Sequence, residues 1–111
     1  MQKSELLQGT LDLLVLKILV LGPNHGWGIA NRIRQMSHEE LSASQGSLYP
    51  ALQRALLQGW VKAEWKMTET NRRARFYTLT AAGRKQLGIE VSQFEQMIEA
   101  IGRVLTDAQE V

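Results

Sequence analysis

The chain has 111 residues, a formal net charge of +2 and no cysteine. Its length suits one domain with a modest core, and the lack of cysteine excludes disulfides and thiolate-bound zinc or redox centres. The charge is unevenly spread: residues 30–85 carry ten basic and four acidic side chains, whereas residues 86–111 carry one basic and five acidic side chains. A basic middle followed by an acidic end is typical of a nucleic-acid-facing module joined to a segment with another task.

The first predicted helix begins at Thr10, with Asp12 in its first turn, and runs to about Leu21. Charged residues interrupt it and it falls short of the roughly 20 apolar residues that a membrane span needs, so we expect a core helix and no membrane partner. The N-terminus also lacks the order of segments found in a secretory signal, and we expect a cytoplasmic protein. Because apolar residues cover nearly the whole helix, it should pack against both the core and a partner chain.

A turn over residues 22–26 precedes a second predicted helix, from Trp27 to about Met36. The polar segment 37–45, with a short turn of helix at 38–41, then leads to a third helix. Two helices joined by a polar connection and followed by a helix with one packed side indicate a helix-turn-helix.

The third helix is predicted to start between Ser44 and Ser47 and to end at Gly59. Pro50 is placed in the first turn, where its missing N–H has no partner within a helix. Leucines and alanines at helical spacing form the packed side, which leaves the other side free to enter a major groove. For Tyr49, a place in the core is the alternative. The candidate DNA contacts of this helix are Ser47, Tyr49, Pro50, Gln53 and Arg54.

Alternating apolar and charged residues predict a strand over Val61–Met67. A polar turn over Thr68–Arg73 leads to a second strand, Ala74–Leu79, and the two strands form a hairpin wing. Basic side chains gather at its tip, either as a solvated turn or as contacts to DNA phosphates. The candidate phosphate contacts are Arg72, Arg73 and Arg75.

Thr80 is a predicted N-cap for a last helix, from about Ala81 to Leu105. Its apolar residues are spaced by four and three, as in a heptad seam, and so small a domain offers the seam no partner. We therefore expect a homodimer, with residues 1–80 as the DNA-binding domain and residues 81–111 as the dimerisation helix of one compact unit. The predicted dimer interface comprises Leu14, Ile18, Leu87, Val91, Phe94, Ile98, Ile101 and Leu105.

Four segments together resemble the PadR-like transcriptional regulators in their short form with a single C-terminal helix: GTLDLLVLKIL, HGWGIANRI, GSLYPALQRALLQGWV and RRARFYTLTAAGRKQL. The resemblance spans roughly residues 6–105. It implies a mainly α, winged helix-turn-helix fold with a two-stranded β-wing, a homodimer built through the first and last helices, and binding to promoter double-stranded DNA, usually as a repressor. Matched to the family, Ser47, Tyr49 and Pro50 would face DNA. The sequence departs from the family late in the third helix, where Arg54 alone remains charged.

Some short PadR-like proteins bind flat hydrophobic drugs between their subunits, which makes a small hydrophobic ligand a candidate partner. The tryptophans at positions 27, 60 and 65 are interpreted first as core residues and second as the walls of such a pocket. The candidate effector-pocket residues are Trp27, Phe94 and Met97. His25 and His38 are far apart and lack a metal-binding motif, and no catalytic constellation is present, so we expect no metal, no cofactor and no enzymatic activity.

The sequence therefore favours a homodimeric repressor that places two copies of the third helix in successive major grooves of a pseudo-palindromic operator, roughly 34 Å apart. The alternative, from another class, is a protein-interaction or assembly module that keeps the winged scaffold without operator recognition.

Overall fold

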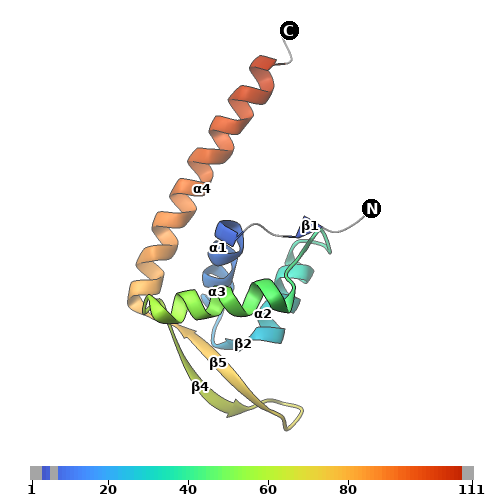
Figure 1. Ribbon diagram of the computed structural model, residues 1–111, viewed down its shortest axis with the longest axis vertical. Coiled ribbons are helices and arrows are strands. Elements are labelled where there is room, and N and C mark those ends of the chain that lie inside the picture. Colours follow the sequence, from blue (N-terminus) through green and yellow to red (C-terminus); the bar gives the residue numbers. More distant parts are fainter. Residues whose placement is uncertain (1–3, 6–7, 109–111) are drawn as a thin grey trace.

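The computed structural model describes residues 4–5 and 8–108. A compact helical domain carries two projections, the hairpin of β4 (Val61–Met67) and β5 (Arg73–Leu79) and the helix α4 (Ala81–Ala108). The hairpin points to the lower end and α4 to the upper end of the molecule in Figure 1, and the whole measures 59 × 34 × 21 Å. The mainly helical fold with a two-stranded wing is as predicted. The helices are α1 (Gln8–Leu19), α2 (Gly26–Met36), α3 (Gln45–Leu57) and α4 (Ala81–Ala108), and the strands are β1 (Ser4–Glu5), β2 (Asn24–His25), β3 (Leu41–Ser42), β4 (Val61–Met67) and β5 (Arg73–Leu79).

Three short strands, β1, β2 and β3, were not predicted. Strand β2 lies in the segment expected to be only a turn, and it extends the hairpin to a three-stranded antiparallel sheet of order β2-β5-β4. Strand β3 pairs in parallel with β1. The predicted turn of helix at 38–41 is wrong, because His38 and Glu39 adopt left-handed backbone angles, with φ of 55° and 67°, that stop the chain from continuing as a helix.

Helix α1 lies at the centre of the fold and contacts α2, α3, α4 and β5. It begins at Gln8, so the predicted start at Thr10 with Asp12 in the first turn is wrong. Its packing against the core is confirmed, whereas its contact with a partner chain stays a prediction. Its buried residues are Leu11, Leu13, Val15, Leu16, Ile18 and Leu19.

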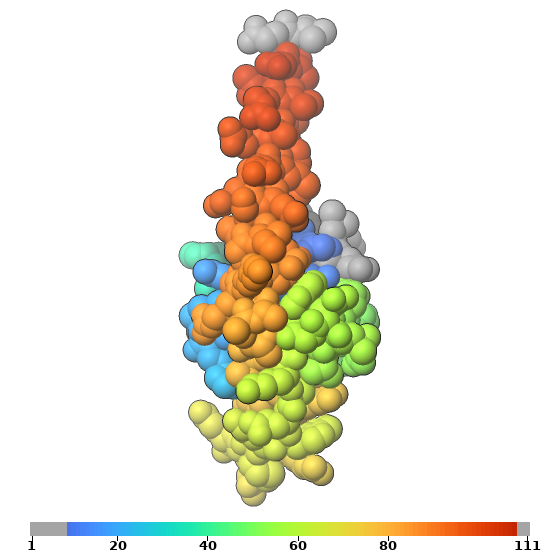
Figure 2. Space-filling model, turned by 90° about the vertical axis from the view of Figure 1, so that its left-hand side faces the viewer, coloured from blue at the N-terminus to red at the C-terminus, as the bar shows by residue number. Residues whose placement is uncertain are grey.

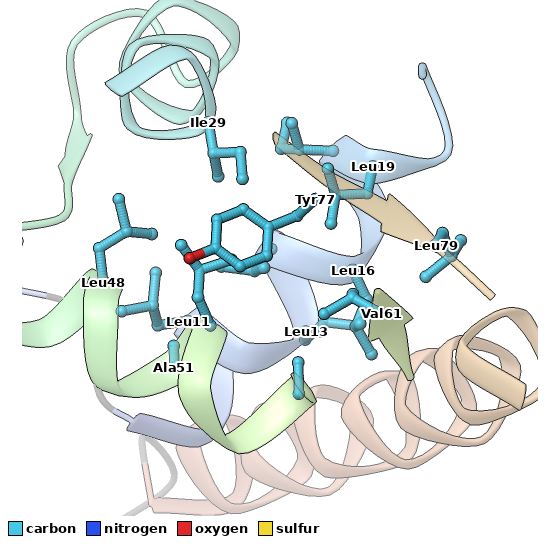
Figure 3. Close-up of a cluster of buried hydrophobic side chains, with 14 of the residues drawn as sticks. Leu11, Leu13, Leu16, Leu19, Ile29, Leu48, Ala51, Val61, Tyr77 and Leu79 are labelled. Atoms are coloured by element: carbon cyan, nitrogen blue, oxygen red, sulfur yellow. The ribbon is translucent and has the colours of Figure 1, made fainter. Parts of the chain in front are cut away.

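The core joins the three domain helices to the base of the sheet. In Figure 3, the Tyr77 ring of β5 lies in the middle of the cluster, between Ile29 of α2 and residues of α1 and α3. Val61 and Leu79, which are paired across β4 and β5, close the cluster on the sheet side. The hairpin is thus fixed at its base by the same apolar cluster that fixes α3.

Helix α3 has a defined end on each side. Ser44 is its N-cap, and its hydroxyl accepts a hydrogen bond from the Ser47 N–H at 3.2 Å. At the other end Gly59 has a φ of +77°, its N–H donates to the Leu56 carbonyl, and the next N–H donates to the Ala55 carbonyl. This is the Schellman arrangement, and it confirms Gly59 as the cap. Pro50 lies in the second turn rather than the first.

The start of α4 is locked against the end of α3. The Thr80 hydroxyl accepts from the Gly83 N–H at 3.0 Å and donates to the Gly59 carbonyl at 2.7 Å, which confirms Thr80 as the N-cap. Gly83 is buried, and a side-chain carbon there would overlap the Trp60 carbonyl oxygen and lie 2.7 Å from Leu79 Cδ1. Only glycine lets α4 approach the sheet this closely.

Helix α4 packs against the domain over its first half, as far as Phe94. Leu87 is buried against the domain, whereas Ile98, Ile101 and Leu105 are exposed. Figure 2 shows the outer half of α4 standing clear of the domain as a single helix. No helix in the described ranges combines the length and apolar character needed to cross a membrane.

Candidate nucleic-acid interface

One side of α3 is packed and the other is open. Leu48, Leu52 and Ala55 face the core, and the intervening positions Tyr49, Pro50 and Gln53 are exposed. Ser47 is half-buried, because it belongs to the hydrogen-bonded N-terminal cap. The structure therefore separates a packed ridge from a polar front, and that front carries four of the five residues predicted for α3.

Tyr49 connects the front of α3 to the sheet. Its side chain is 49% exposed, so it is not a core residue, and its ring packs against Gly26 at the start of α2. Gly26 directly follows β2, which pairs with β5 through Asn24–Tyr77 and His25–Phe76. Contacts therefore link the exposed side of α3, through Tyr49 and the β2–α2 junction, to the hairpin.

Arg54 does not belong to the open face. Its Nη2 lies 2.7 Å from Asp12 Oδ1 and its Nε lies 3.3 Å from Asp12 Oδ2. The guanidinium thus donates two hydrogen bonds to this carboxylate of α1. This pairing corrects the interpretation of Arg54 as the long charged side chain left free to read a base. Gln53, one position earlier, keeps an exposed side chain.

The predicted wing arginines lie on two parts of the hairpin. Arg72 belongs to the loop, whose ends are closed by the Thr68 N–H donating to the Arg72 carbonyl at 2.7 Å. Arg73 and Arg75 lie on β5, which begins one residue earlier than predicted. All three side chains are exposed, and no ion pair engages them within the described part of the chain.

Basic side chains of the hairpin lie over aromatic rings. Arg73 Cζ is 4.9 Å from the centre of the Trp65 ring, and Arg75 Cζ is 5.8 Å from that of Tyr77. Lys66, on the other face, lies 5.8 Å from the Phe76 ring and pairs with Glu64 at 3.1 Å. Such stacking holds a cation in place without neutralising it, whereas the carboxylate compensates the charge of Lys66.

The predicted dimer residues divide into three groups by burial. Ile18, only 5% exposed, and Leu87 are buried in the core of their own chain, which corrects their assignment to a surface contact. Leu14, Val91 and Phe94 are half-buried against this core. The exposed group consists of Ile98, Ile101 and Leu105.

Two of the three predicted effector-pocket residues lie together. Phe94 and Met97 line a shallow groove of about 370 Å³ between α1 and α4, with Leu13 and Glu90. Trp27 is not among the lining residues; it is 69% exposed at the start of α2, where its ring stacks on His25. Within one chain, the structure thus brings Phe94 and Met97 together but not Trp27, and a pocket between subunits that all three share stays a prediction.

Glu90 is an unusual member of the groove. Its Oε2 atom is buried and has no hydrogen-bond partner among the described residues. Burial, and then repulsion by the Asp12 carboxylate, raise the pKa of Glu90 above that of an ordinary carboxyl. The groove thus combines apolar walls with a carboxyl group whose ionised form is disfavoured.

Sequence reasoning missed two exposed aromatic residues, because Trp27 and Trp65 were interpreted first as core. Trp65 is 58% exposed, although it alternates with Val61 and Ala63 as a core residue would. The signal that could have identified it is its distance along the strand from the base of the hairpin, since only the base lies over the helices.

The chain combines a helix-turn-helix that has an exposed polar front with a basic β-hairpin and a long C-terminal helix. This combination defines a winged helix-turn-helix regulator. The sequence profile described as the transcriptional regulator PadR-like family matches residues 15–89. The chain belongs to this family, whose members regulate transcription.

Solved structures share this architecture. A transcriptional regulator from Clostridium thermocellum is similar with a TM-score of 0.79 and 26% identity, over 86% of this chain and 93% of that one. A PadR family transcription regulator from Clostridium difficile has the same fold, with a TM-score of 0.72 and 24% identity over 86% of this chain and 97% of that one. A Lysinibacillus sphaericus protein designated uncharacterized protein X is 21% identical over 101 residues, which cover 91% of this chain and 93% of the relative.

Proposed function

We propose that this protein is a DNA-binding transcriptional repressor that acts as a homodimer on a pseudo-palindromic operator. The observation that supports this most is the link from the exposed side of α3, through Tyr49 and β2, to a hairpin whose exposed surface carries Arg72, Arg73 and Arg75. Uncompensated arginines on such a surface suit phosphates, because contact with DNA releases its counterions.

Within this proposal α3 enters the major groove and the hairpin lies along the adjacent backbone. Tyr49, Gln53 and the Ser47 hydroxyl are the polar groups of α3 that would meet base edges or phosphates, with Pro50 in contact beside them. Arg54 would act indirectly, by fixing α3 to α1 through Asp12. Base reading then rests on few side chains, and phosphate contacts would supply most of the affinity.

The dimer would form through α4. Its exposed apolar residues continue the seam of Val91 and Phe94 outward, and a second copy would cover them. The outer part of α4 and the tip of the basic hairpin lie toward opposite ends of the molecule (Figure 1), so a dimer joined at α4 would leave both wings free for DNA. Residues 81–111 would thus act as the dimerisation segment of one unit.

A small hydrophobic effector would enter the groove at Phe94 and Met97. The groove lies between α1, which holds the core together, and α4, which would hold the dimer. A ligand that binds one arrangement of these helices better than another would shift the population of dimers competent for DNA.

A second candidate function is assembly with another protein. The pairing of Arg54 with Asp12 favours this second function. Arg54 is the one charged residue of α3, and the pairing removes its side chain from the surface that would read bases. The winged scaffold would then serve protein contacts alone.

Hydroxyl-radical footprinting on the DNA upstream of the protein's own gene tests the proposed function. We expect two protected segments roughly 10 base pairs apart, as two copies of α3 one helical turn apart would produce. A dimer that leaves this DNA unprotected at low salt would favour the assembly function.

A further inference from the structure

The outer end of the hairpin has two chemically different faces. The register pairs Trp65 with Arg75 and Met67 with Arg73, and alternation along each strand places these four side chains on one face. The same face is buried at the base of the hairpin, where it carries Val61 and Leu79, and it becomes exposed where the strands extend past the helices. The outer core-side face, defined as Trp65, Met67, Arg73 and Arg75, is therefore an exposed continuation of the core side of the sheet.

Charge on the outer core-side face is uncompensated. Neither Arg73 nor Arg75 is in an ion pair with any described residue. On the opposite face, Glu64 lies 3.1 Å from Lys66 and offsets its charge. Of the two faces, the outer core-side face is thus the one that attracts an anion.

Trp65 determines how Arg73 is presented. The guanidinium carbon of Arg73 lies 4.9 Å from the centre of the indole ring, although the two residues are diagonal rather than paired across the strands. A guanidinium stacked on a ring keeps its N–H groups in its own plane, where they can still bind phosphate oxygens through two hydrogen bonds. A side chain held in this way loses less conformational freedom when it binds.

We propose that the outer core-side face is the surface of the hairpin that meets the DNA sugar–phosphate backbone, and that Trp65 is a positioning residue for Arg73. This inference rests on the proposed DNA-binding function and deepens it. Trp65 acts through Arg73, by holding the guanidinium ready for a phosphate. Lys66 lies on the face turned away from DNA.

A double-mutant cycle on the full chain tests the inference. The variants are Trp65→Val, Trp65→Phe and Arg73→Ala, with Trp65→Val and Arg73→Ala also combined, and Lys66→Ala serves as the matched control on the opposite face. Affinity is measured by fluorescence anisotropy with a labelled mixed-sequence DNA duplex over a series of salt concentrations. Thermal unfolding of each variant checks the fold, and Trp65→Thr replaces Trp65→Val if the latter does not fold.

Trp65→Val should weaken binding roughly 2- to 5-fold for each hairpin engaged, the range of an exposed cation–π contact, and Trp65→Phe should restore most of the affinity. The slope of log affinity against log salt is negative, and Arg73→Ala should make it less steep, by about 0.9 for each phosphate that the variant no longer binds. In the Arg73→Ala background, Trp65→Val should have no further effect, because its role requires the guanidinium. Lys66→Ala should leave the slope nearly unchanged.

An equal decrease in affinity from Trp65→Val with and without Arg73 would overturn the positioning role, and so would no decrease at all. A larger slope change for Lys66→Ala than for Arg73→Ala would overturn the choice of face. An effect of Trp65→Val on dimer dissociation alone would assign the face to a second copy of the chain and overturn the inference. If the unmodified protein itself binds no duplex, the proposed DNA-binding function fails together with this inference. The outcomes above are different, because in them the unmodified protein binds DNA and only the variants depart from expectation.

Discussion

Arg54 of α3 donates to both carboxylate oxygens of Asp12 of α1, at 2.7 and 3.3 Å, and thereby ties the helix proposed for the major groove to the central helix of the core. The side chains are 33% and 19% exposed, so solvent screens the pair only in part. The bond joins residues 42 positions apart in sequence and adds a polar link between α3 and α1 beside the apolar contacts of Leu52 and Ala55.

Arg54→Ala and Asp12→Ala should each lower the free energy of unfolding, by about 1–2 kcal/mol, because each leaves a partly buried charge without its partner. The double variant should be destabilised by less than the sum of the two single variants. Urea unfolding measures all three. At a temperature where both proteins are folded, the salt dependence of DNA binding should be the same for Arg54→Ala as for the unmodified protein. A weaker salt dependence in the variant would instead make Arg54 a direct phosphate contact.

Gly83→Ala should destabilise the protein by roughly 1–3 kcal/mol, because the added carbon overlaps the Trp60 carbonyl to which Thr80 is bonded. Gly88, in the same helix, has open space around it, and Gly88→Ala should instead stabilise the helix by roughly 0.5–1 kcal/mol. The two melting curves should therefore shift in opposite directions. Shifts in the same direction would contradict the close approach of α4 to the sheet.

The raised pKa of Glu90 makes stability depend on pH. The folded state holds this proton to higher pH than the unfolded state, so the contribution of Glu90 to stability falls as the pH rises from its ordinary pKa of 4.5 through the raised value. Glu90→Gln removes this penalty. The variant should gain stability relative to the unmodified protein as the pH rises through that window, in denaturation measured at fixed protein concentration. A stability difference between Glu90→Gln and the unmodified protein that does not change with pH would refute the raised pKa of Glu90.

Charge placed on the outer seam of α4 should separate the proposed dimer. Ile98→Glu and Ile101→Glu alter side chains that are exposed within one chain, so each monomer should stay folded while the dimer dissociates. Gln96→Glu adds the same charge off the seam and should leave the dimer intact. Sedimentation equilibrium measures the association constant of each. A dimer that survives both seam variants would place the interface elsewhere.

Much of the fold follows from local signals in the sequence. The alternation in β4, the cap at Gly59 and the cap at Thr80 depend on neighbouring residues, and the structure has all three where they were predicted. The strand β2 could not be foreseen, because its two residues gain their strand geometry only from pairing with β5.

The candidate site was less predictable for the same reason. Helical spacing places Arg54 on a polar side, but its partner Asp12 is 42 residues earlier and cannot be inferred from spacing. Likewise, alternation gives Trp65 a core-facing position, and only the length of the hairpin beyond the helices shows that the ring is exposed.

The salt dependence of binding to the DNA upstream of the protein's own gene tests the central claim most directly. The unmodified protein should bind with log affinity that falls linearly with log salt. Each wing of the proposed dimer has three exposed arginines. The combined Arg72→Ala, Arg73→Ala and Arg75→Ala variant should therefore have a less steep slope of log affinity against log salt, its magnitude smaller by up to about 5. Equal slopes for the two proteins, or no binding by the unmodified protein at low salt, would contradict a regulator that holds DNA through its hairpin.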